Sequence, residues 1–192
     1  MSGLSTLILT DLPEDAGGVA GRYVLTWEGQ GTLALEGRAE VAEAVPGRIV
    51  FDYTPGPGAV IVTLTAIDPA DPIRNIVVVR ADRAEALAAG DVFNPDWLAR
   101  IRGASGLRFM DWMATNDSKL SKAADRPKPA DYTWARAGVP METLIALANE
   151  LEADPWFTLP HLSEDALVRD WAELVERDLN PSLVAHVEFS NE

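Results

Sequence analysis

The sequence contains no cysteine and only two histidines, His161 and His186. The absence of cysteine excludes a disulfide scaffold, thiol catalysis and thiolate metal sites, and two histidines are too few for a histidine-rich metal site. We therefore expect no metal and no other cofactor. No apolar run approaches the roughly 18 residues that a membrane span needs. Residues 1–15 have neither a basic region nor an unbroken apolar stretch, so they do not resemble a secretory signal.

Positive charge is also scarce in this sequence. Its 192 residues include 16 Lys and Arg against 30 Asp and Glu, which gives a formal charge of -14. Because this charge repels polyanions, we expect no nucleic-acid partner, whereas a neutral or cationic ligand is easier to accommodate. The remaining composition, 47% hydrophobic and 24% charged, is typical of a soluble globular protein with one domain or two small ones.

The composition changes near residue 81. Ten of the 14 glycines precede this point, and five of the six tryptophans follow it. Apolar and polar residues alternate in 23–27 and 49–53, and Gly- and Pro-rich turns separate such segments. We therefore predict a small antiparallel, β-rich, sandwich-like domain in residues 1–81. Its expected strands cover residues 4–10, 21–27, 32–35, 48–53, 60–67 and 73–80.

Residues 82–192 show helical periodicity instead and form the second predicted domain. The expected helices cover 81–89, 95–102, 140–152 and 163–178, and the expected strands cover 106–112, 155–160 and 183–189. This alternating order predicts a parallel sheet with right-handed crossovers and ligand-binding residues at the carboxyl ends of its strands. The 26-residue segment 114–139 is either a binding loop or a flexible connector.

The last predicted strand has two different faces. Leu183, Ala185, Val187 and Phe189 form an apolar face, whereas His186 and Glu188 lie on a polar one. The polar face either lines the interior of a closed barrel or belongs to an edge strand with one solvated side. The roles of His161 and of the tryptophans also stay open. His161 is a ligand-binding or a structural histidine, and Trp112, Trp134 and Trp156 either stack on sugar rings or pack in the core.

Several sequence strings resemble a known family. They are RFMDWMATN at 108–116, ADPWF at 153–157 and VEFSNE at 187–192. These strings are similar to those of clan A glycoside hydrolases, and in particular of bacterial proteins described as cellulose-binding or glycosidase-like. The resemblance implies an α/β fold, with a partial (β/α)8 barrel of about three βα units after the small antiparallel β-rich domain. It also implies an extracellular or cell-surface location.

The resemblance assigns roles to individual residues. Glu192 would be the catalytic acid/base, and Asn191 would hold a sugar hydroxyl. The other substrate-binding residues would be His161, Arg108, Trp112 and Asp111. The ligand would be a polysaccharide or oligosaccharide, cleaved by a two-carboxylate mechanism.

The family's nucleophile lies on a later strand, so we expect this chain to be an N-terminal fragment that lacks the rest of its barrel and is inactive alone. The alternatives are a non-catalytic carbohydrate-binding or cellulose-binding module, which would use the exposed tryptophans, and a structural surface module.

Overall fold

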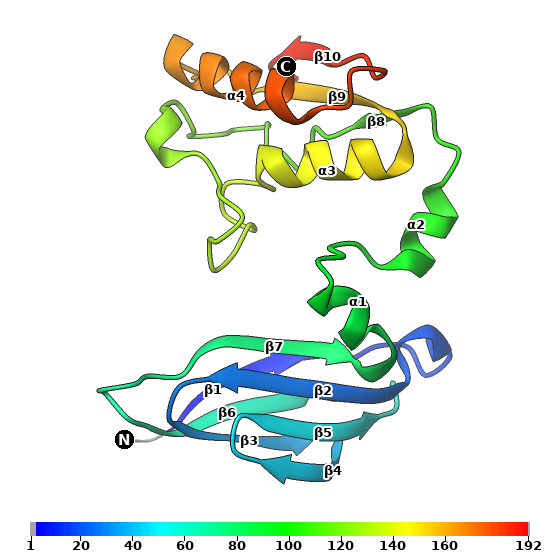
Figure 1. Ribbon diagram of the computed structural model, residues 1–192, viewed down its shortest axis with the longest axis vertical. Coiled ribbons are helices and arrows are strands. Elements are labelled where there is room, and N and C mark those ends of the chain that lie inside the picture. The colour runs from blue at the N-terminus through cyan, green and yellow to red at the C-terminus, as the bar shows by residue number, and fades with distance from the viewer. Residues whose placement is uncertain (1–2, 192) are drawn as a thin grey trace. The chain divides into compact units, whose positions relative to one another are not determined.

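The computed structural model describes residues 3–191 of the protein (Figure 1). Packing contacts divide the chain into two compact units, Met1–Val92 and Phe93–Glu192. Each unit has a hydrophobic core cluster of its own, so each unit is described by itself.

The first unit consists of seven antiparallel strands in two sheets. The strands are β1 (Leu4–Ile8), β2 (Gly21–Glu28), β3 (Gly31–Gly37), β4 (Ala39–Val45), β5 (Arg48–Tyr53), β6 (Val60–Ile67) and β7 (Arg74–Arg80). One sheet has the order β1-β6-β3, and the other has the order β4-β5-β2-β7. The unit also contains the short helix α1 (Ala84–Ala88) and two 3-10 turns at Gly17–Val19 and Ala81–Arg83.

Alternating side chains of the two sheets form the core of this unit. Leu25 in β2, Phe51 in β5 and Val60 in β6 are fully buried, and the rings of Tyr23 and Phe51 stack with their centroids 5.4 Å apart. Successive side chains of a strand point to opposite faces, so one apolar residue in two is enough to fill the space between the sheets.

The second unit combines three parallel strands with helices. Its elements are α2 (Pro95–Ile101), β8 (Gly106–Arg108), a 3-10 turn (Ala123–Asp125), α3 (Met141–Leu151), β9 (Asp154–Leu159), α4 (Asp165–Asp178) and β10 (His186–Phe189). The strands pair in the order β10-β9-β8. Helix α2 begins where Pro95 follows a capping residue, because the side chain of Asn94 accepts a hydrogen bond from the Asp96 amide at 2.9 Å.

Helices α3 and α4 cover one face of the parallel sheet. Phe157 of β9 is buried in the same cluster as Leu144 and Ile145 of α3 and Leu167 and Trp171 of α4. The amphipathic patterns of the two helices thus bury their apolar stripes against one side of the strands. By alternation, the residues on either side of Phe157 point to the opposite face.

The structure shows that the predicted fold class, a partial (β/α)8 barrel after a β-rich domain, is wrong. Most of the strands in residues 3–191 are antiparallel, and only β8, β9 and β10 run parallel, in a small open sheet with β8 and β10 as its two edges. Strand β8 ends at Arg108 because Phe109–Met113 forms a turn, closed by the bond from the Met113 amide to the Phe109 carbonyl oxygen at 2.8 Å. The polar side of β10 therefore belongs to an edge strand.

Within residues 3–191, no helix combines the length and the apolar character that crossing a membrane requires.

Candidate functional site

A row of side chains crosses the sheet of the second unit on the face away from α3 and α4. The strand register places Arg108 of β8, Trp156 of β9 and His186 of β10 beside one another. Polar groups at the carboxyl ends of β8 and β10 join this row. We call the set the Arg108 cluster, and its members are Arg108, Asn116, Trp156, His186, Glu188 and Asn191.

Arg108 lies at the centre of the cluster. Its Nη2 atom is 3.0 Å from Oε2 of Glu188, and its Nε atom donates to the same oxygen at 3.3 Å. Nη2 also donates to Oδ1 of Asn191 at 2.8 Å. The guanidinium carbon lies 5.3 Å from the ring centroid of Trp156, within the range of a cation–π interaction. The guanidinium is therefore held in one orientation by a carboxylate, an amide and an aromatic ring.

Asn191 connects Arg108 to the loop that follows β8. Its Nδ2 atom donates to Oδ1 of Asn116 at 3.1 Å, while its own Oδ1 accepts from Arg108. The side-chain amide of Asn191 thus accepts a hydrogen bond through its oxygen and donates one through its nitrogen. It joins the segment after β10 to the segment after β8. This geometry places the polar groups at the carboxyl ends of the parallel strands, where open α/β sheets bind ligands.

Trp156 supplies the aromatic surface of the cluster. Its side chain is 42% exposed, and its ring lies between Arg108 on one neighbouring strand and His186 on the other, with 6.4 Å between the Trp156 and His186 ring centroids. Asp154 anchors the amino end of this face, because its Oδ1 accepts from the Val184 amide at 2.8 Å. The accessible indole is thus surrounded by groups that both donate and accept hydrogen bonds.

The residues predicted from the resemblance do not all meet in one place. Arg108 and Asn191 are in direct contact. Trp112 instead stacks on Trp97 of α2, with ring centroids 5.8 Å apart. Asp111 and His161 are exposed, and within residues 3–191 no side-chain hydrogen bond or ion pair connects either of them to the Arg108 cluster. Glu192, the predicted acid/base, lies outside the described residues.

The prediction from sequence missed Glu188 and Asn116 as members of the cluster. A signal for Glu188 was present, because it alternates with His186 on the polar face of the last strand. Asn116 carries no such signal, since its contact depends on the path of an irregular loop.

Comparison of the chain with protein-family models, with curated proteins and with solved structures found no match. The resemblance to glycosidase-like proteins therefore stays a prediction, and the function is argued from the geometry of the Arg108 cluster.

Proposed function

We propose that the Arg108 cluster is a non-catalytic carbohydrate-binding site. The observation that supports this most directly is the half-exposed indole of Trp156 beside a guanidinium that Glu188 and Asn191 hold in place. A sugar ring offers an apolar C–H face and a rim of hydroxyl groups. An aromatic ring can pack on the apolar C–H face, and fixed hydrogen-bond donors and acceptors can bind the hydroxyl groups.

Binding is favoured over hydrolysis by the position of Glu188. Both of its carboxylate oxygens lie within 3.3 Å of Arg108 Nη2, so its role is to orient the guanidinium. A glycosidase needs one carboxyl group that protonates the leaving oxygen and a second carboxylate that attacks or activates water. An ion-paired Glu188 fits neither role, whereas it fits a rigid binding surface.

Retention on insoluble polysaccharides tests the proposal. We expect the wild-type chain to bind at least one neutral glycan, and we expect Trp156→Ala to abolish retention because the stacking surface is lost. Trp112→Ala is the matched control, because Trp112 is 41% exposed but stacks on Trp97 instead of joining the cluster. Equal losses in the two variants would contradict the assignment of the site.

A second comparison tests the polar part of the cluster. Arg108→Lys keeps the charge but cannot contact Glu188 and Asn191 with the same planar fork. We therefore expect glycan affinity to fall about tenfold or more, the size of effect that a charged hydrogen bond of about 1.5–3 kcal/mol produces. Release of reducing ends by the wild type, lost in Glu188→Gln, would replace the binding proposal with an enzymatic one.

A further inference from the structure

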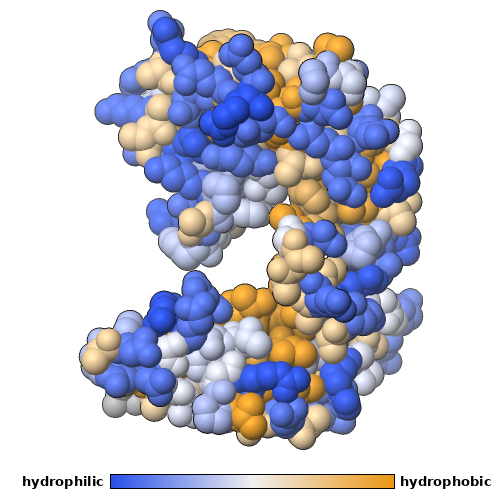
Figure 2. Space-filling view, in the orientation of Figure 1, coloured by the Kyte–Doolittle hydropathy of each residue, from blue (hydrophilic) through white to orange (hydrophobic). Residues whose placement is uncertain are grey.

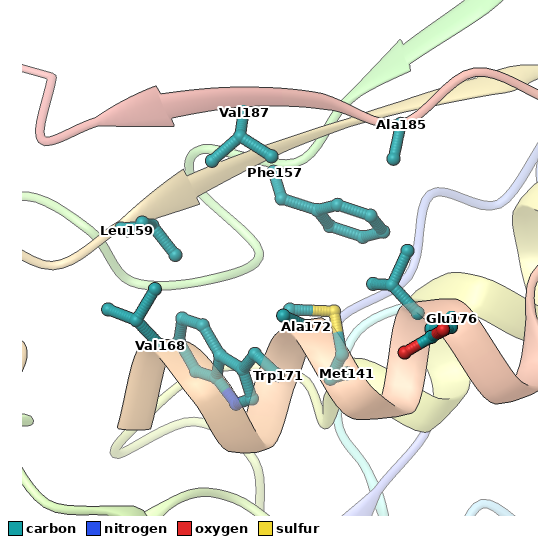
Figure 3. Close-up of a pocket in the computed structure, with 10 residues that line it drawn as sticks. Met141, Phe157, Leu159, Val168, Trp171, Ala172, Glu176, Ala185 and Val187 are labelled. Atoms are coloured by element: carbon teal, nitrogen blue, oxygen red, sulfur yellow. The ribbon is translucent and has the colours of Figure 1, made fainter. Parts of the chain in front are cut away.

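The two faces of the parallel sheet have different surroundings. In the view of Figure 2, hydrophilic residues cover most of the second unit. Figure 3 shows Phe157 and Leu159 between the strands and α4, where they line an apolar cavity of about 260 Å³. Because side chains alternate along β9, Trp156 points to the opposite face, into the Arg108 cluster. A ligand of the cluster therefore meets the polar face of the sheet, away from this cavity.

Arg108 keeps one end of its guanidinium unpaired. Its Nε and Nη2 atoms donate to Glu188, and Nη2 also donates to Asn191. Within residues 3–191, the Nη1 atom has no hydrogen-bond partner. The side chain of Arg108 is 37% exposed, so the N–H groups of Nη1 are available to a ligand.

The guanidinium also sets the orientation of two side-chain amides. Because a guanidinium only donates, Asn191 must present its Oδ1 atom to Arg108, which turns its Nδ2 atom toward Asn116. Asn116 must then accept through its Oδ1 atom, at 3.1 Å. In the part of the chain that the structure describes, the Nδ2 atom of Asn116 has no hydrogen-bond partner, and the residue is exposed. This series of hydrogen bonds therefore ends in a second unpaired donor.

The oxygen atoms of the cluster are already engaged. The two carboxylate oxygens of Glu188 accept from Arg108 Nη2 at 3.3 and 3.0 Å, and the Oδ1 atoms of Asn191 and Asn116 each accept one hydrogen bond. The unpaired groups at this end of the cluster are therefore N–H donors. A hydroxyl group both donates and accepts, whereas a carbonyl or carboxylate group only accepts, so a carbonyl or carboxylate group complements these donors better.

Charge decides between a carbonyl and a carboxylate ligand. The ion pair with Glu188 offsets the charge of Arg108. Asp154 adds a second carboxylate at the amino end of the same face, where its Oδ2 atom lies 3.9 Å from Nε2 of His186. Over the whole chain, 30 Asp and Glu oppose 16 Lys and Arg. An anionic sugar is therefore repelled, whereas an uncharged carbonyl group is not.

We propose that the ligand of the Arg108 cluster is a glycan built from N-acetylated sugars, an inference that rests on the carbohydrate-binding function proposed above. The acetamido group combines an uncharged carbonyl acceptor with a methyl group. Its carbonyl oxygen accepts from Arg108 Nη1, and its methyl group packs on the exposed indole of Trp156, whose centroid lies 5.3 Å from the guanidinium carbon. The Nδ2 atom of Asn116 donates to another oxygen of the same glycan.

Comparison of cellulose, chitin and chitosan tests the proposal. These polysaccharides share one backbone and linkage, and their sugar rings carry a hydroxyl, an acetamido and an amino group, respectively, at the same carbon. We expect calorimetric titration with soluble oligomers of equal length to show about tenfold or more tighter binding of the chitin oligomers, the effect of one added hydrogen bond and a methyl contact. Equal or tighter binding of the cellulose or chitosan oligomers would overturn the inference and leave the carbohydrate-binding function standing.

Asn116→Asp tests the assignment within the cluster. The change keeps the oxygen that accepts from Asn191 and replaces the unpaired Nδ2 donor with a carboxylate oxygen. We expect the affinity for chitin oligomers to fall about tenfold and the affinity for chitosan oligomers to rise, because a carboxylate attracts the protonated amine. Asn75→Asp is the matched control, because it makes the same charge change at an exposed residue of β7 in the first unit, and its affinities should equal those of the wild type.

The remaining outcomes also decide the proposal. An Asn116→Asp variant with wild-type affinities would overturn it, and circular dichroism verifies that the variant is folded. The comparison of oligomers uses the wild-type chain, so it decides the proposal without any variant. A wild-type chain that binds other neutral glycans but not chitin oligomers would overturn this inference alone. A chain that binds none of the glycans tested would overturn the carbohydrate-binding function as well.

Discussion

Arg38 holds the loop between β5 and β6 with a single side chain. Its Nε, Nη1 and Nη2 atoms donate to the carbonyl oxygens of Thr54, Pro57 and Pro55 at 2.9, 3.0 and 3.1 Å. Gly56 has a φ of +149°, and a Cβ atom there would lie 2.8 Å from Arg38 Nη2. The loop is thus shaped around the guanidinium.

Arg38→Ala removes this support, and we expect it to lower the free energy of unfolding by about 1.5–3 kcal/mol, because hydrogen bonds from a charged donor are lost. Urea denaturation measures the change. Arg48→Ala is the control, since Arg48 forms an exposed ion pair with Glu43, and such a pair contributes about 0–1 kcal/mol. Equal losses in the two variants would show that Arg38 does not hold the loop.

A buried pair of hydroxyl groups gives a second prediction at the residue scale. Thr115 and Thr158 are almost fully buried, and their Oγ1 atoms are 2.5 Å apart. Thr115 also reaches the Met110 carbonyl oxygen at 3.1 Å, whereas the further side-chain contact of Thr158 is the Met113 sulfur at 3.9 Å. Removing the Thr115 hydroxyl therefore leaves Thr158 poorly satisfied.

We expect Thr115→Val to lower the free energy of unfolding by about 1–3 kcal/mol, the penalty for a buried polar group without a partner. Thr158→Val should lower the free energy of unfolding by less, since the Thr115 hydroxyl keeps its hydrogen bond to the Met110 carbonyl oxygen. The double variant should be more stable than Thr115→Val alone, because no unpaired hydroxyl remains. Thermal and urea unfolding of the three variants measure this non-additivity, and additive losses would contradict it.

The candidate site was only partly predictable at this scale. Arg108 and Asn191 were predicted from sequence strings, and the structure brings them into contact. Glu188 was placed on the correct face by the period of two in its strand. Asn116 and the stacking of Trp112 on Trp97 depend on how segments far apart in the sequence come together. Local periodicity carries no information about such contacts between distant segments.

At the scale of elements, one arginine fixes the long segment 114–139 to two helices. Arg126 Nη1 lies 2.8 Å from Oε1 of Glu142 in α3, and its Nε lies 2.6 Å from Oδ2 of Asp170 in α4. Its side chain is 14% exposed. The segment is therefore anchored at its middle, which favours a structured loop over the flexible connector.

Arg126→Ala leaves two neighbouring carboxylates without their counter-charge. We expect the free energy of unfolding to fall by about 1–3 kcal/mol, between the values for exposed and for buried ion pairs. We also expect faster cleavage of the segment by trypsin after Lys119 or Lys122. Arg136→Ala is the control, since it removes a charge from the same segment at a residue whose contact is a 3.4 Å bond to the Tyr132 hydroxyl. Because this change also removes the cleavage site after Arg136, both variants are compared by cleavage after Lys119 and Lys122. Unchanged proteolysis in Arg126→Ala would argue against the anchor.

The elements themselves followed from the sequence better than their arrangement did. The strands expected from alternating residues in 21–27 and 48–53 coincide with β2 and β5. No strand is expected in residues 39–45, because alanine and glutamate are uncommon in strands, yet β4 forms there by pairing with β5. Tertiary pairing decided the structure of this segment against its local preference.

At the scale of the whole molecule, the barrel prediction failed because alternation does not determine closure. The two faces of β10 are apolar and polar in the structure, as the sequence indicates. An edge strand and a barrel strand share that pattern, and only the number of strands and their stagger distinguish them. Those quantities depend on pairing between distant segments, and here the parallel strands form an open sheet of three.

The separate core of the first unit leads to a prediction for the molecule as a whole. Leu25, Phe51 and Val60 belong to a cluster drawn entirely from Met1–Val92, and a chain of about 90 residues can bury enough surface to fold alone. We expect residues 1–92, produced as a separate polypeptide, to show a strand-rich circular dichroism spectrum and one cooperative urea transition. Arg38→Ala should lower its stability by the same free energy as in the full chain, because the contacts of Arg38 lie wholly within this unit. A broad, non-cooperative transition, or an Arg38→Ala variant indistinguishable from its parent, would mean that the first unit needs the rest of the chain in order to fold.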